Sequence, residues 1–254
     1  MMRILSLFFL LLVANPASAV EAIVKDGDTI QIGNVAYKLA GLDAPEVDQP
    51  CVDEHADNWA CGVEARDQLV KLIGKREVRC EDLGEDKIYK NRRAGLCSVV
   101  GETGSLNQAV TQSGYAVSIE PSDKVSAKTS FKPDETAAKD KRQGLWRGCF
   151  VTPAEFRRKA SDSPLLGSAC RSDKDKELRA ALFPADLAMP AGCNIRAKQV
   201  RRAKFTGHVG VYLIPQCQNY ATQPKPDRWF CSEDDARAAG YRKALNCQAP
   251  SRRN

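Results

Sequence analysis

The chain has few long apolar runs and nothing after its first residues that could cross a bilayer. The one apolar stretch near the start, Ile4 to Val13, is too short to span. Arg3 precedes it and Ala17-Ser18-Ala19 follows it, which is typical of a secretory signal peptide. We expect residues 1–19 to be removed after about Ala19 and the mature protein to be periplasmic or secreted, without stable membrane insertion. An uncleaved leader acting as a tether is the alternative.

The chain also has only two histidines and no Cys-x-x-Cys pair, which argues against a zinc site. Its ten cysteines all follow the expected cleavage point, and an even number in an exported chain favours disulfides. Cys51 and Cys61 flank one loop, and Cys80 and Cys97 fall in two predicted neighbouring strands, so we expect the pairs Cys51–Cys61 and Cys80–Cys97. The six cysteines from Cys149 onward allow fifteen connectivities, and the sequence does not choose among them.

Charge is distributed unevenly along a chain of net charge +6 that contains no internal repeat. Residues 20–160 hold 21 basic and 23 acidic side chains (net −2), whereas residues 161–254 hold 16 and 9 (net +7). The densest basic cluster is a candidate grip for a polyanion, and a solvated charged face is the alternative. Its members are Arg196, Lys198, Arg201, Arg202 and Lys204.

Hydrophobic periodicity predicts an α+β fold that is mainly β. We expect three strands within 23–39, a helix over 59–73 that ends at Gly74, strands over 77–81 and 93–99, a further strand candidate over 115–119, and helices over 105–112 and 134–143. Strands that close on themselves, with one helix between the third and the fourth, predict a five-stranded OB-type barrel with about three helices.

The composition divides the mature chain into three parts. Residues 20–160 form the barrel domain, and residues 161–192 have the composition of a linker with one helix candidate over 175–182. Residues 193–254 form a small, disulfide-rich, basic module. We expect in it a strand over 209–214 and a helix over 233–239 that is capped by Ser232.

Two short runs carry the chemistry. Lys25-Asp26-Gly27-Asp28-Thr29 places Asp28 at the end of one predicted strand, and the run Lys38 to Glu46 places Asp43 at the end of a neighbouring strand, with Glu46 one turn further on. The first run alone is a common chain reversal, and its continuation does not match an EF-hand loop. Three acids that converge beside a small barrel indicate a hard divalent cation and a general base.

Together these runs resemble the staphylococcal (thermonuclease-type) nuclease family over roughly residues 22–146. The likeness also rests on residues 60–65, on Leu106-Asn107, on Gly114-Tyr115-Ala116 and on Gly144-Leu145-Trp146. The C-terminal module resembles a small cysteine-containing domain that follows such nucleases in exported bacterial proteins, through Cys193-Asn194-Ile195 and the run from Arg228 to Glu233.

The resemblance implies a Ca²⁺-dependent nuclease that hydrolyses DNA, with RNA left open as a second substrate. It implies that Asp28, Asp43 and the carbonyl of Ala44 bind Ca²⁺, and that Glu46 activates the attacking water. A hard cation between carboxylates and phosphate neutralises the charge that develops in the transition state, and a carboxylate beside the water accepts its proton.

The family also uses two arginines to bind the phosphoryl oxygens, and here the sequence departs from the pattern. The first position falls on Lys38, which offers a point charge where a planar two-pronged donor is usual, so we expect reduced activity. The second falls on Arg92, with Arg93 as the alternative. The tyrosines expected to stack on a nucleotide are not evident; Tyr89 is the nearby candidate, with a packing role as its alternative.

Two other classes of function remain open. The same barrel with weakened catalysis could serve as a binding module for nucleic acid or an acidic envelope polysaccharide. The protein could also be a structural component of the envelope in which the basic cysteine-containing module matters most. In these cases the acids would be turn-capping or solvated residues and the cations would be surface charge.

Overall fold

The computed structural model describes residues 21–55, 57–86, 91–119, 130–200 and 208–247. The expected signal peptide, Tyr89, and Arg201, Arg202 and Lys204 of the basic cluster lie outside the described residues. Within the described parts, no helix is both long and apolar enough to cross a membrane.

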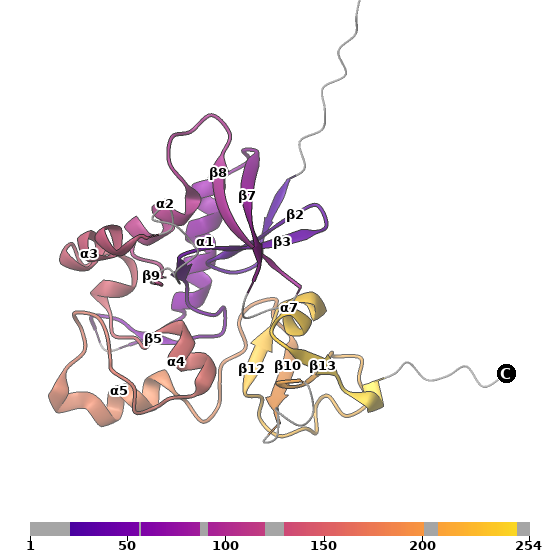
Figure 1. The fold of residues 1–254 in the computed structure, drawn as a ribbon. Helices are drawn as coiled ribbons and strands as arrows, with labels where there is room; N and C mark the ends of the chain where they lie inside the picture. The colour runs from indigo at the N-terminus through magenta and orange to yellow at the C-terminus, as the bar shows by residue number, and fades with distance from the viewer. Residues whose placement is uncertain (1–20, 56, 87–90, 120–129, 201–207, 248–254) are drawn as a thin grey trace, which may run out of the picture.

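The first half of the chain is built on a five-stranded sheet with the order β1-β2-β3-β8-β7 (Figure 1). Antiparallel pairs join β1 to β2, β2 to β3 and β7 to β8, while β3 and β8 run parallel with Lys38 opposite Ala94. The strands are β1 (Ala22–Val24), β2 (Thr29–Ile32), β3 (Val35–Leu39), β7 (Val78–Glu85) and β8 (Arg93–Val99).

The sheet differs from the predicted barrel in one respect. In the described residues no ladder joins β7 back to β1, so the sheet is not a closed five-stranded barrel. The chain instead forms two small separate ladders, one between β4 (Leu42–Asp43) and β9 (Val117–Ser118), the other between β5 (Cys51–Val52) and β6 (Asn58–Trp59). The architecture is mixed α+β, as predicted.

Helix α1 (Cys61–Ile73) buries Cys61, Ala65, Leu69 and Ile73, which recur every four residues and therefore share one face. Leu69 and Ile73 pack against the sheet, and Cys61 packs in a second cluster with Trp146 and Phe150. Val70 lies off this face and is 47 % exposed. Helices α2 (Leu106–Gln112) and α3 (Lys132–Asp140) follow, and then the short 3₁₀ helix η2 (Gly144–Arg147).

The fully buried side chain of Asn107 links α2 to two strands. It donates to the carbonyls of Ala40 (2.9 Å) and Gly95 (3.0 Å) and accepts from the amide of Cys97 (3.0 Å). A buried amide that satisfies three backbone groups ties the end of β3 to the middle of β8, because each group would be costly to leave unpaired.

The predicted linker is packed rather than free. After helix α4 (Pro153–Arg158) come the 3₁₀ helix η3 (Ser172–Lys174) and α5 (Asp175–Leu182). Leu178, Leu182 and Leu187 are buried against Val52 and residues of the barrel domain, and a disulfide joins Cys149 to Cys170. The apolar spacing of Leu178 and Leu182 gives α5 a face to bury, so the segment belongs to the packed fold.

The C-terminal module has its own sheet with the order β12-β10-β11-β13. Its strands are β10 (Ile195–Gln199), β11 (Gly210–Leu213), β12 (Arg228–Phe230) and β13 (Tyr241–Lys243). Helix α7 (Glu233–Ala238) begins after Ser232, whose side chain accepts from the amide of Asp235, and the 3₁₀ helix η4 (Leu245–Cys247) ends the described chain.

Five disulfides pair all ten cysteines. Cys51–Cys61 and Cys80–Cys97 are the two pairs that we expected. The sequence had left the other three open, namely Cys149–Cys170, Cys193–Cys231 and Cys217–Cys247. A chain stabilised in this way is typical of proteins that mature in an oxidising compartment.

One glycine near the site tests how tightly this fold is packed. A Cβ added at Gly62, in the first turn of α1, would lie 1.7 Å from the carbonyl oxygen of Glu46, so either α1 or the loop carrying Glu46 would have to move. We expect Gly62→Ala to lower the free energy of unfolding by about 1–3 kcal/mol or more, as overpacking does. Urea unfolding measures it, with Asp67→Ala at an exposed position of the same helix as the control. Equal stability of the two variants would contradict the close approach.

Candidate active site

The first acidic run forms the turn between β1 and β2. The backbone amide of Lys25 donates to the carbonyl of Thr29 (2.9 Å), and the amide of Asp28 donates to the side chain of Asp26 (3.0 Å). A Cβ at Gly27 would lie 2.7 Å from that of Ala44, so glycine lets this turn approach the second run closely. The two runs therefore meet in space, as the sequence predicted.

Asp28 and Asp43 lie next to each other and hold a cation between them. Their residues are 4 % and 3 % exposed, and the ammonium of Lys38, also buried, donates to Asp28 Oδ2 and lies 3.4 Å from Asp43 Oδ1. The amide of Ala44 donates to Asp28 Oδ2 at 2.6 Å.

The pKa values of Asp28 and Lys38 result from burial and neighbouring charge, which act in opposite directions. Burial alone would raise the pKa of Asp28, but Lys38 and the Ala44 amide hold it below its usual range. Burial alone would lower the pKa of Lys38, but Asp28 and Asp43 raise it. Asp28 and Lys38 are therefore both charged at neutral pH.

Glu46 has a cation on each of its oxygens. Arg157 Nη1 donates to Oε1 at 2.7 Å and Arg228 Nη2 donates to Oε2 at 2.8 Å. Although burial opposes ionisation, these two guanidinium groups lower the pKa of Glu46 to about 2. The Glu46 carboxylate is consequently charged at every physiological pH.

The loop that carries Glu46 is held in place by Gln49. Its amide donates to the Glu46 carbonyl (2.8 Å), and its side chain, 1 % exposed, donates to the carbonyl of Val151 (2.9 Å). The Cys51–Cys61 disulfide closes the same loop. The position of Glu46 is thus fixed by a buried polar contact and by a covalent bond.

Arg157 links two of the acids. It lies on α4, and its Nη1 and Nη2 donate to Asp43 Oδ1 (3.0 Å) and Oδ2 (2.9 Å) while Nη1 also reaches Glu46. Two parallel N–H···O bonds to one carboxylate make the planar, two-pronged contact that arginine forms and lysine cannot.

Two arginines were considered at the start of β8, namely Arg92, just before the strand, and Arg93, its first residue. Only Arg92 lies at the site. Arg92 is 8 % exposed, its Nη1 donates to Thr29 Oγ1 (3.0 Å), and its Nε donates to Asp86 (3.0 Å). Arg93 instead pairs with Asp82 at the surface of the sheet, with 40 % of its side chain exposed.

A single pocket of about 350 Å³ contains most of these groups. It lies between the barrel domain and the C-terminal module, so both contribute to its walls. The charged and polar residues that line it include Asp26, Asp28, Lys38, Glu46, Arg92, Arg157 and Arg228.

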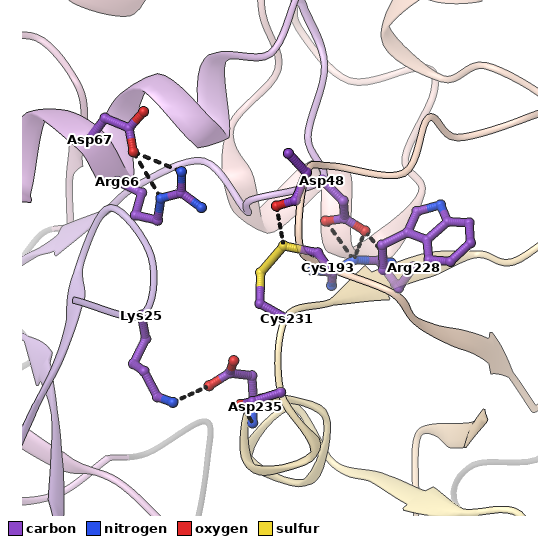
Figure 2. Close-up of a disulfide and its surroundings, with 11 residues drawn as sticks. Lys25, Asp48, Arg66, Asp67, Cys193, Arg228, Cys231 and Asp235 are labelled. Atoms are coloured by element: carbon purple, nitrogen blue, oxygen red, sulfur yellow. Dashed lines mark hydrogen bonds and ion pairs between the residues drawn. A yellow bond between two sulfur atoms is a disulfide. The ribbon is translucent and has the colours of Figure 1, made fainter. Parts of the chain in front are cut away.

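Ion pairs hold the C-terminal module beside the pocket, and these pairs differ widely in how deeply they are buried (Figure 2). Asp48, whose side chain is fully buried, accepts from Arg228 Nε (3.1 and 2.9 Å) and from the amide of Trp229 (2.7 Å). Lys25 and Asp235 form a looser contact of 3.4 Å closer to solvent. Arg228 therefore connects Glu46, Asp48 and the module.

The sequence analysis did not identify Arg157 or Arg228 as site residues. They are 111 and 182 residues away from Glu46, so no local spacing connects them to the acids. A helix-start signal was nonetheless present for α4, since Thr152 caps it, Pro153 follows and Glu155 stands in its first turn.

The basic cluster of the C-terminal module is only partly described. Arg196 donates to the backbone carbonyls of Tyr220, Gln223 and Pro224, and Lys198 donates to Asp227 (3.0 Å). Both side chains thus stabilise the module internally. Tyr115 donates from its hydroxyl to Glu64, and it is not among the residues lining the pocket.

The fit of a divalent cation can be judged from the donors. Asp28 and Asp43 offer the hard oxygens that Ca²⁺ prefers, and the Lys38 ammonium between them shows that the pair accepts a cation there. No group of three or more Asp, Glu, His or Cys side chains in the described residues has metal-binding geometry. A divalent cation at this position would have to displace Lys38, with the Ala44 carbonyl as a further oxygen donor.

The turn between β1 and β2 also contains Asp26, whose ionisation has a measurable effect on stability. Burial and the neighbouring Asp28 raise its pKa from 3.8 to about 7. The folded state thus favours the protonated carboxyl, and this stabilisation, complete below pH 3.8, is lost as the pH rises through about 7.

Asp26→Asn keeps an oxygen for the Asp28 amide, so we expect it to raise the melting temperature more at pH 8 than at pH 5. Thermal unfolding in chelator measures it, and equal shifts at both pH values would contradict it.

The α+β fold with a pocket lined by acids and cations is consistent with a nuclease-like protein, and comparison with known proteins agrees. Residues 36–148 match the model of the family described as staphylococcal nuclease homologue. The chain is 32 % identical over 143 residues to the succinoglycan biosynthesis protein ExoI of Rhizobium meliloti (strain 1021), covering 54 % of this chain and 71 % of that protein. The chain belongs to the staphylococcal nuclease homologue family. Arg157 and Arg228 lie outside the matched segment.

Proposed function

We propose that this protein is an exported nuclease that hydrolyses phosphodiester bonds of DNA, with RNA as a second substrate to be tested. One observation carries the proposal: a single pocket brings Asp28 and Glu46 together with Lys38, Arg92, Arg157 and Arg228. Phosphodiester hydrolysis needs an acceptor for the proton of water and positive charge for the phosphoryl oxygens, and both are present within this one cavity.

Glu46 is the group that we assign to proton transfer from water. It is ionised, it is held on a fixed loop, and it faces the pocket. Its two guanidinium partners keep its basicity low in the present arrangement, and a phosphate that draws Arg157 away would raise it. Arg92, which is oriented by Thr29 and Asp86, supplies positive charge from the position just before β8.

Asp28, Asp43 and the Ala44 carbonyl are the groups that would hold Ca²⁺, which when bound supplies charge neutralisation at the phosphate. When Ca²⁺ displaces Lys38 from Asp28 and Asp43, the Lys38 ammonium would lie at the wall of the pocket as a point charge. An arginine at the same position would give a two-pronged contact.

A second candidate function is a binding module with weak or no catalysis. It is favoured by the pairing of Asp28, Asp43 and Glu46 with Lys38, Arg157 and Arg228, which leaves each acid already neutralised. The name of the relative ExoI, a succinoglycan biosynthesis protein, makes a polysaccharide a natural alternative ligand to nucleic acid.

One substrate panel separates the two functions. Oxidised protein is incubated with single- and double-stranded DNA, RNA and an acidic polysaccharide, each with Ca²⁺, with Mg²⁺ and with chelator, and both bound and cleaved ligand are measured. We expect cleavage of nucleic acid that requires a divalent cation. Tight binding without any cleavage would favour the binding module instead. A signal for export is tested separately, by finding the mature chain in the periplasm or medium without residues 1–19.

A further inference from the structure

Six cationic side chains line the pocket in the described residues. Lys25 and Arg237 pair with Asp235 and Asp234 of the C-terminal module, and three of the other four are committed to contacts beside the acids. Lys38 bridges Asp28 and Asp43 with its ammonium. Arg92 bonds Thr29 and Asp86, and 9 % of its side chain is exposed. Arg228, with 5 % of its side chain exposed, spans Glu46 and the fully buried Asp48, and so holds the C-terminal module. Each of these side chains, like Arg157, would give up a buried ion pair by turning toward a ligand, so exposure and position must distinguish Arg157 from them.

Arg157 differs in exposure and in position. Its side chain is 16 % exposed, and its guanidinium touches Asp43 and Glu46 at once. In the proposed function Asp43 holds the cation and Glu46 activates water, so the phosphate must lie between these two carboxylates. The guanidinium of Arg157 already lies between them.

The backbone beneath Arg157 is well fixed. Helix α4 starts at a Thr152 cap followed by Pro153, its Phe156 is 6 % exposed in the neighbouring hydrophobic cluster, and the side chain of Gln199 donates to the Arg157 carbonyl (3.4 Å). Because the helix is held on two sides, a change of partner at the guanidinium would not need the helix to move.

We propose that Arg157 is the two-pronged phosphate donor of this site, and that it supplies from α4 the guanidinium that position 38 lacks. This inference rests on the proposed function. On substrate binding, the phosphate oxygens replace the carboxylate oxygens of Asp43 and Glu46 as acceptors for Nη1 and Nη2. The exchange replaces three charge-assisted hydrogen bonds to carboxylates with two to phosphate, and it frees both acids for their own roles.

The test uses equilibrium binding of a short single-stranded oligonucleotide in chelator, with cleavage in Ca²⁺ measured in parallel. We expect Arg157→Gln to weaken binding roughly 10- to 100-fold, as loss of charged hydrogen bonds does. Arg157→Lys, which keeps the charge without the fork, should lie between. The control is Arg158→Gln, at the next position, where 66 % of the side chain is exposed and bonded to Glu155, and it should bind as the wild type does.

The decisive variant restores a guanidinium from the other side of the pocket. With Ca²⁺ present to take the place of residue 38 between the two aspartates, Lys38→Arg added to Arg157→Gln should recover most of the affinity that Arg157→Gln loses under the same conditions. A double variant no tighter than Arg157→Gln, or equal binding by Arg157→Gln and Arg158→Gln, would overturn the assignment and leave Arg157 as a neutralising partner of Asp43. Absence of cleavage by the wild type would count against the proposed nuclease activity, while the affinity series would still decide the role of Arg157.

Discussion

Replacing Asp43 with asparagine is expected to reduce nucleic-acid cleavage by at least about 100-fold, the scale on which removing a charge-stabilising group acts. The variant takes one of two carboxylates from the aspartate pair that holds the Lys38 ammonium, and it removes the two-pronged acceptor of Arg157. Initial rates of cleavage with Ca²⁺ measure the effect.

The same variant should not lose affinity for nucleic acid. Asparagine removes one negative charge from beside the pocket, so binding of an oligonucleotide in chelator should be equal or tighter. Asp57→Asn, an exposed acid outside the pocket, serves as the matched control and should change neither quantity. An Asp43→Asn protein that cleaves at the wild-type rate would remove Asp43 from the chemistry.

The second large effect concerns stability. Asp48→Ala is expected to lower the free energy of unfolding by about 3–5 kcal/mol, because it leaves the buried guanidinium of Arg228 without its fully buried partner. It also removes the acceptor of the Trp229 amide, so the C-terminal module should detach more readily. Urea unfolding measures it, together with the rate at which a protease cuts at the junction near residue 193.

The control for this prediction is a more exposed ion pair between the two parts of the molecule. Asp235→Ala removes the contact of 3.4 Å with Lys25, whose side chain and that of Asp235 are 18 % and 24 % exposed. Such pairs contribute at most about 1 kcal/mol. Equal losses from Asp48→Ala and Asp235→Ala would mean that Arg228 does not anchor the module.

The sequence predicted best what depends on local pattern. The strands around Ile30 and Tyr37, helix α1 with its end at Gly74, and the Ser232 cap of α7 follow from alternation, four-residue spacing and capping chemistry within a few neighbours. The approach of Asp28 to Asp43 was also predicted from local pattern, although Asp28 directly precedes β2 of the five-stranded sheet whereas Asp43 ends β4 of a separate ladder.

What the sequence did not predict depends on contacts between distant parts of the chain. Arg157 and Arg228 reach Glu46 only because α4 and the C-terminal module fold back beside the loop that carries Glu46. The packing of residues 161–192 was missed because their Ser, Asp and Pro content outweighed the single pair of Leu178 and Leu182. The sheet was expected to close, but β4 and β9 pair with each other instead.

These long-range contacts change the interpretation of Lys38. From the sequence alone, lysine at this position weakens the cationic half of the site. In the structure Lys38 serves the acids, and the guanidinium contact to Asp43 and Glu46 comes from α4. The site therefore depends on parts of the chain beyond the segment that the family model matches.

The measurement that tests the nuclease proposal most directly is single-turnover cleavage of an end-labelled oligonucleotide by excess oxidised protein in Ca²⁺, comparing the wild type with Glu46→Gln. Glutamine keeps the size of Glu46 and removes its charge, so the variant can still bind substrate but cannot accept a proton from water. We expect the wild type to cleave the bound oligonucleotide and Glu46→Gln to bind it without cleavage. Cleavage at the same rate by both proteins, or by neither, would contradict the account.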